Sequence, residues 1–172
     1  KLSISSQQTI KYAACIGLKF DLWTLSVIRN QSYLETIEEL KDLISQDFLF
    51  LSDISLKKLN SISNLNFTTE EAKQLNYQFQ HDRIQNAVYE LIQEDERKEI
   101  QIIIGRLHLA LNFSEENIFE IVDHLNAGID KIVDLTEKKR LIELNLQAAM
   151  KSKLSTAYEL ALKYLNQAFN LL

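Results

Sequence analysis

The stretch Tyr77-Gln78-Phe79-Gln80-His81-Asp82-Arg83-Ile84-Gln85 joins two hydrophobic periodicities. Apolar and polar residues alternate over residues 77–80, which predicts a short strand. Over residues 84–91 the apolar side chains instead recur every three or four positions, which predicts an amphipathic helix. We therefore expect a strand that runs directly into a helix, and the residues around this junction decide the fold.

Upstream of the junction, the pattern predicts three short helices and a second strand. The first helix ends near Gly17, the second opens at Phe20-Asp21-Leu22-Trp23, and Ser32 can cap the third. The apolar run Phe48-Leu49-Phe50-Leu51 is typical of a strand. Three short helices followed by a two-stranded hairpin is the order of a winged-helix domain.

The segment between the two expected strands has weak periodicity. Residues 52–75 are rich in Ser, Asn, Lys and Leu, which predicts a wing loop or insertion with room for a helical turn. Several asparagines in and just after this segment do not suit a core, so we expect the segment to be exposed. These asparagines are Asn60, Asn64, Asn66 and Asn76.

Everything after the junction has helical spacing. Residues 136–172 predict two helices joined near residues 153–155. Ala149, Ala161 and Ala168 match the small-residue positions of a tetratricopeptide unit, where paired helices approach closely. The sequence thus predicts a mainly α fold. It has a winged-helix-like domain over residues 1–92 and, over 93–172, an α-helical domain that starts a tetratricopeptide-like array.

Composition excludes several function classes. The formal net charge is -5, and the expected third helix carries four acidic residues and one Lys over residues 32–42, so nucleic acid is not an expected partner. No apolar run approaches the roughly 20 residues of a membrane span, so no membrane partner is expected either. The chain holds three glycines, and no pair has the spacing of a phosphate-binding P-loop. Cys15 is a lone cysteine that suits a helix core, and we expect a cytoplasmic protein.

The sequence offers no evident catalytic or metal centre. Its histidines are His81, His108 and His124, none of which shares a helical face with another. No cysteine or carboxylate cluster joins them, so we expect no metal site. No nucleophile–base arrangement stands out, so we expect no catalytic residue and no enzyme activity in this fragment.

His81 and Asp82 are the residues with the most informative position. They lie where the expected strand meets the expected helix, and backbone N–H groups at a helix N-terminus attract phosphate. A histidine there can donate to a phosphate group, or it can fix the strand–helix turn without any ligand. Local chemistry leaves both interpretations open.

These residues resemble a known pattern. A winged-helix domain whose last strand runs into a His-Asp-led helix is similar to the signal-transduction NTPases with numerous domains, the STAND class, which carry a Met-His-Asp motif at this junction. His81 and Asp82 match that motif, and Gln80 replaces the Met. The longer run His81-Asp82-Arg83-Ile84-Gln85-Asn86-Ala87-Val88-Tyr89-Glu90-Leu91-Ile92 resembles the AAA-type ATPase segment of large bacterial signalling proteins. Those proteins combine Ser/Thr-kinase-like, ATPase, GAF and histidine kinase domains.

The resemblance implies a role and partners. It implies that His81, beside Asp82, senses the β-phosphate of ADP held by an upstream NTPase domain. The fragment would carry no cofactor itself, and ATP or ADP would bind the parent protein, an ATPase and Ser/Thr or histidine kinase. The expected partners are that NTPase domain, downstream signalling domains of the same chain and a protein partner on the helical tail. The chain begins at Lys1 and its helical pattern runs to the last residue, so we expect a piece of a longer protein.

The leading hypothesis is a non-catalytic regulatory and coupling fragment of a bacterial signal-transduction protein. It would sense nucleotide state and relay it through helical repeats. Two alternatives remain open. One is a protein-interaction scaffold without nucleotide linkage, and the other is a winged-helix regulator that binds DNA.

Overall fold

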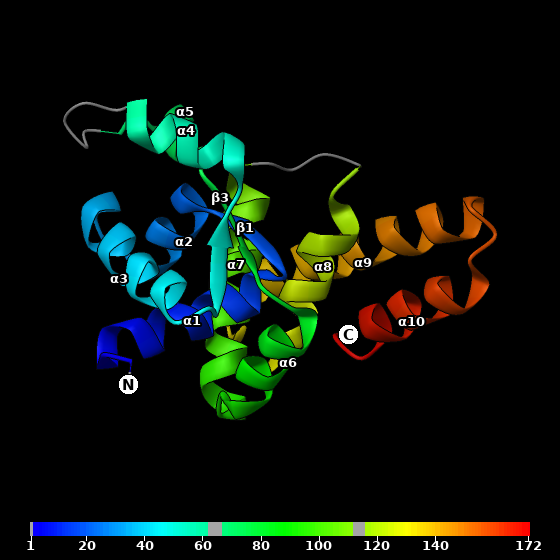
Figure 1. Ribbon diagram of the computed structural model, residues 1–172. Coiled ribbons are helices and arrows are strands. Elements are labelled where there is room, and N and C mark those ends of the chain that lie inside the picture. Colours follow the sequence, from blue (N-terminus) through cyan, green and yellow to red (C-terminus); the bar gives the residue numbers. More distant parts are fainter. Residues whose placement is uncertain (1, 62–66, 112–115) are drawn as a thin grey trace. The chain divides into compact units, whose positions relative to one another are not determined.

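A computed structural model describes residues 2–61, 67–111 and 116–172 (Figure 1). The chain divides into two compact units, Lys1–Glu94 and Asp95–Leu172, which we call the first and second unit. The domain boundary expected from the sequence lies between residues 92 and 93. Each unit is described by itself.

The first unit combines helices with a small sheet. Its elements are α1 (Ile4–Ile16), β1 (Lys19–Asp21), α2 (Leu22–Arg29), α3 (Tyr33–Ser45), β2 (Leu49–Leu51), α4 (Asp53–Ser61), α5 (Thr69–Lys73), β3 (Asn76–Phe79) and α6 (Asp82–Leu91).

The strands of the first unit form an antiparallel sheet in the order β1-β3-β2. Phe20 of β1 is opposite Tyr77 of β3, and Leu49 of β2 is opposite Phe79. The rings of Phe20 and Tyr77 stack with their centroids 5.9 Å apart. The predicted mainly α fold is confirmed. With α4 and α5 inserted between β2 and β3, the order of helices and strands agrees with that of a winged helix.

Strand β1 corrects the expected start of the second helix. Phe20 and Asp21 were expected to open that helix, yet both belong to β1 and α2 begins at Leu22. Asp21 is instead the N-cap of α2, because its carboxylate accepts a 2.8 Å hydrogen bond from the backbone N–H of Thr24. A strand this short has no readable periodicity, and its pairing with distant β3 defines it.

The segment 52–75 is also corrected, because it is largely helical where the structure describes it. Helices α4 and α5 lie within it, and α5 begins with a capping box between Thr68 and Glu71. Ser55 is buried and accepts a 2.9 Å hydrogen bond from the backbone N–H of Asn76. The insertion is therefore tied to the end of β3. Asn76 is exposed as expected, whereas residues 62–66, with Asn64 and Asn66, and the side chain of Asn60 lie outside the described part.

The core of the first unit lies between α1, α2, α3 and the sheet. Leucines of α2, α3 and β2 are buried in it together with aromatic residues of β1 and β3, and Cys15 of α1 is buried as predicted. Ser32 caps α3 in a capping box with Glu35, which also agrees with the prediction. Within the described part of this unit, the fully buried leucines and phenylalanine are Leu22, Leu25, Leu40, Leu43, Leu49, Leu75 and Phe79.

The second unit is helical throughout the residues that the structure describes. It contains α7 (Glu94–Leu111, whose first residue belongs to the first unit), α8 (Ile118–Ala127), the 3₁₀ turn η1 (Ile129–Lys131), α9 (Leu135–Leu154) and α10 (Tyr158–Phe169). The turn between α9 and α10 comprises residues 155–157, two residues after its predicted place. The two helices run back along each other as an antiparallel hairpin (Figure 1).

Small and polar residues allow close packing in the second unit. Ala149, Ala161 and Ala168 are all buried between or beside α9 and α10, as their spacing predicts. Asn145 of α9 is fully buried and exchanges two side-chain hydrogen bonds, of 2.9 and 3.0 Å, with Asn126 of α8. This reciprocal pair satisfies both amides and fixes the register of α8 against α9.

Every helix in the described part of the chain is too short or too polar to cross a bilayer.

Candidate functional site

His81 lies exposed at the junction between β3 and α6. It is the N-cap residue of α6 with extended backbone angles, φ -146° and ψ 147°, and its side chain makes no capping hydrogen bond. The junction is fixed by the backbone, since the N–H of Gln80 donates to Phe48 O at 3.0 Å and that of Ile84 donates to His81 O at 3.0 Å. The imidazole is therefore not used to form the turn.

Asp82 is the first residue of α6 and is also exposed. Its Oδ1 accepts a 2.7 Å hydrogen bond from the backbone N–H of Arg83, so the carboxylate is engaged locally. Helix α6 rests on α1, where Gln85 donates a 2.8 Å hydrogen bond to Ala14 O. The helix thus holds His81 at the surface of the first unit, beside a helix N-terminus whose dipole favours an anion.

The helix that contacts DNA in many winged-helix proteins is α3, and here it is acidic. Glu35 and Glu38 are exposed on it, and Glu35 is held by the capping box with Ser32. Hydrogen bonds from Ser32 hold the pKa of Glu35 below its usual range, so its charge persists in mild acid. Such a surface repels a phosphate backbone.

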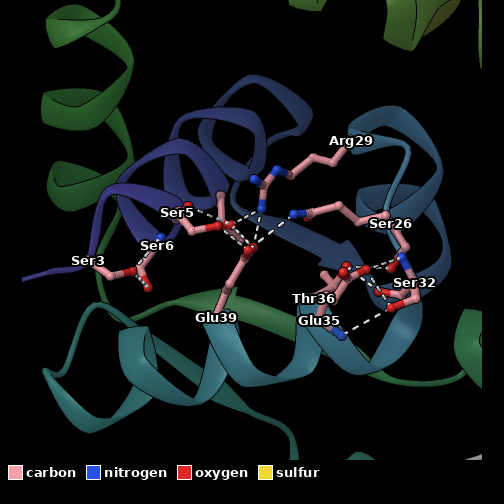
Figure 2. A network of polar contacts seen from close by, with 11 residues as sticks. Ser3, Ser5, Ser6, Ser26, Arg29, Ser32, Glu35, Thr36 and Glu39 are labelled. Carbon is pink, nitrogen blue, oxygen red and sulfur yellow. Dashed lines mark hydrogen bonds and ion pairs between the residues drawn. The ribbon is translucent and has the colours of Figure 1, made fainter.

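Glu39, also on α3, points into the first unit instead of into solvent. Figure 2 shows it at the centre of a polar network that joins α1, α2 and α3. It accepts hydrogen bonds from Ser5 and Thr9 of α1 and pairs with Arg29 of α2. Burial raises its pKa, but these hydrogen bonds and the charge of Arg29 outweigh burial and hold the pKa below its usual value.

The second unit brings together three side chains for which the sequence predicted no contact. His108 of α7, with Glu120 and His124 of α8, places donor atoms within 4.8 Å of one another. His108 Nδ1 lies 3.4 Å from Glu120 Oε1, and the two imidazoles meet edge to face with centroids 5.7 Å apart. The sequence showed no carboxylate cluster beside the histidines, and it did not predict that the single carboxylate of Glu120 lies against two of them. Packing of α7 on α8 creates the cluster, although the four-residue spacing of Glu120 and His124 was a signal.

His124 is half-buried in this cluster. Its Nδ1 is hydrogen-bonded to Gln101 Oε1 of α7. Burial, helped by the charge of neighbouring His108, lowers the pKa of His124 to about 4, so this imidazole is neutral at pH 7. Both His108 and His124 are half-buried.

An apolar groove runs along the α9–α10 hairpin. It encloses about 410 Å³ and is lined mainly by Ile142, Leu146, Leu165, Phe169 and Leu172. Phe169 is 75% exposed there and Leu165 46%. A row of exposed apolar side chains at this spacing is suited to another helix.

Comparison with known proteins gives one informative similarity. The chain is 28% identical over 211 aligned residues to the hybrid signal transduction histidine kinase G of Dictyostelium discoideum. The alignment covers 100% of this chain and 6% of that protein, so the chain spans a small segment of it. No family model matches the chain, and no solved structure matches it.

The similarity supports one part of the expectation, namely that the chain is related to a signalling histidine kinase. The chain resembles a segment of a much longer signal-transduction protein. The comparison gives no support to the STAND or AAA resemblance, to ATP binding or to a bacterial source, since this relative comes from Dictyostelium.

Proposed function

We propose that the chain is a non-catalytic coupling fragment of a larger signal-transduction protein. In this proposal its winged helix senses the nucleotide state of an NTPase domain through His81, and its helical unit passes that state to signalling domains or a partner. The observation that carries the proposal is the exposed imidazole of His81 at the N-terminus of α6. The resemblance to a segment of a hybrid histidine kinase supports the signalling context.

The local chemistry suits a terminal phosphate of ADP. The N–H groups of Arg83 and Ile84 already donate to Asp82 Oδ1 and His81 O, so the imidazole of His81 would be the main donor to a phosphate. The dipole of α6 favours an anion at this end of the helix. Exposed Arg83, the second residue of α6, adds positive charge at the same end. A nucleotide shifts the balance between two states only if it contacts them differently, and a phosphate that meets His81 in one state alone would provide that difference.

The test uses the complete parent protein. We would measure the ADP that copurifies with the wild type, with His81→Ala and with Asn86→Ala, an exposed residue of α6 that serves as a matched control. Loss of a hydrogen bond to a charged phosphate costs about 1–3 kcal/mol, so His81→Ala should weaken ADP binding roughly 5- to 150-fold. Asn86→Ala should retain ADP, and circular dichroism should give the same helicity for all three proteins.

Equal ADP retention by the wild type and His81→Ala would contradict the sensing role. A scaffold role without nucleotide linkage would then lead, and the apolar groove of α9 and α10 supports it as the second candidate. The acidic face of α3 supports neither nucleic-acid binding nor the DNA-regulator alternative. We also expect the 172-residue chain alone to hydrolyse no ATP.

A further inference from the structure

The cluster of His108, Glu120 and His124 has the composition of a metal site. Two imidazoles and one carboxylate are ligands that Zn²⁺ takes in three-ligand sites, with a fourth position left for water. The three donor atoms come from two helices of the same unit and lie within 4.8 Å of one another. The side chain of Glu120 is 52% exposed and that of His108 13%, so the cluster opens to solvent on the Glu120 side.

The distances are close to those that a zinc ion requires. Zinc–nitrogen and zinc–oxygen bonds of about 2.0–2.2 Å place tetrahedral donors roughly 3.3 Å apart. His108 Nδ1 and Glu120 Oε1 already lie 3.4 Å apart. The other pairs of donor atoms lie within 4.8 Å, so side-chain rotation has to bring them closer. The half-exposed Glu120 is free to rotate toward either imidazole.

The backbone around the cluster is held firmly. Gly105 lies one turn before His108, and a Cβ atom there would come within 2.7 Å of Leu125, the residue after His124. Helices α7 and α8 therefore touch beside the cluster, which fixes the spacing of the two histidines.

His124 also has the outer partner that metal-bound histidines usually have. Its Nδ1 is hydrogen-bonded to Gln101 Oε1, and an N–H on Nδ1 leaves Nε2 with its lone pair. In metal sites, an outer hydrogen bond of this kind fixes the tautomer and the ring orientation of a ligating histidine.

We propose that His108, Glu120 and His124 form a site for a zinc-type divalent cation that links α7 to α8. The chemistry favours such an ion over Ca²⁺ or Mg²⁺, which prefer oxygen ligands only. The bound ion holds two neutral imidazoles and one carboxylate and keeps one position open for water. The site makes the second unit responsive to metal, which is independent of the nucleotide-sensing proposal.

The test titrates Zn²⁺ alone into the chelator-treated 172-residue chain, with a chromophoric chelator as competitor. We expect one Zn²⁺ per chain. Glu120→Gln and His108→Gln should each weaken its binding at least about 10-fold, since loss of an outer partner alone costs 10- to 100-fold. Cobalt titration should give the visible absorption of a four-coordinate Co²⁺ ion, and neither variant should give it.

His81→Ala is the matched control, because His81 is the third histidine of the chain and lies in the other unit. It should bind Zn²⁺ as the wild type does. The exposed Glu120 can be replaced without opening the core, so Glu120→Gln keeps the test decisive even if His108→Gln folds poorly. Absence of stoichiometric binding, or wild-type affinity in Glu120→Gln, would overturn the proposal.

Discussion

Arg29 and Glu39 carry opposite charges inside the first unit, where their side chains are 8% and 12% exposed. Arg29 also donates to Thr9, and its guanidinium lies 5.8 Å from the centre of the Tyr12 ring. Breaking such a pair by removing one partner leaves the other charge buried without compensation, and this is the costly step.

We therefore expect Glu39→Ala to lower the free energy of unfolding by about 3–5 kcal/mol. Glu38→Ala is the matched control, because its exposed neighbouring side chain should change stability by no more than about 0.5 kcal/mol. Urea denaturation followed by circular dichroism measures both. Equal stability of the two variants would show that the network in Figure 2 contributes little.

The same carboxylate gives a pH dependence. The folded state lowers the pKa of Glu39, so its contribution to stability is fully present above the unfolded value of about 4.3 and is lost as pH falls through the folded value. The urea midpoint of the wild type should therefore fall below about pH 4 more steeply than that of Glu39→Gln. Parallel pH curves would contradict this assignment.

The role of a single residue could be predicted from the sequence where it depends only on neighbouring residues in the chain. Ser32 as a cap and His81 at a strand–helix junction follow from their immediate neighbours, so the sequence identified both. The site formed by His108 and Glu120 depends on how α7 packs on α8, which no local pattern records. The sensing role of His81 stays a prediction.

At the scale of elements, the long helices were predictable and the short elements were not. Helices such as α7 and α9 have several turns of apolar spacing, so their periodicity is clear. Strand β1 and helix α5 are too short for any period, and they are fixed by pairing with β3 and by a capping box. The insertion 52–75 was misjudged for this reason.

Two glycines set how closely α7 approaches its neighbours, and their substitution makes a paired prediction. A Cβ on Gly128 would meet Lys98 O at 2.5 Å, whereas one on Gly105 would meet chiefly the side chain of Leu125. Overpacking costs about 1–3 kcal/mol, and in α7 a gain of about 1 kcal/mol in helix propensity partly offsets it. Gly128→Ala should therefore lower the melting temperature more than Gly105→Ala. Thermal melts with the reverse order would refute this.

At the scale of the whole molecule, each unit has its own core. The second unit buries Ile121, Leu144 and Tyr164 together, and the first buries its own leucines around the sheet. Independent cores are the property that lets a fragment fold alone.

We expect residues 1–94 and 95–172 to fold when expressed separately. Circular dichroism should give fragment spectra that sum to that of the whole chain, each with a cooperative thermal transition. A cut inside α3, after Leu40, divides a core and should give unfolded fragments. An unfolded 95–172 fragment would contradict the division into two units.

The pairing of β1 with β3 has a consequence for biosynthesis. Lys19 is opposite Gln78, so the sheet joins the beginning of the first unit to its end. Contacts between residues this distant in sequence form slowly, because the chain loses the entropy of closing a long loop before the contacts stabilise it. The nascent first unit cannot complete its sheet until β3 has left the ribosome. The hairpin of α9 and α10 closes between adjacent helices, so its folding can follow elongation almost without delay.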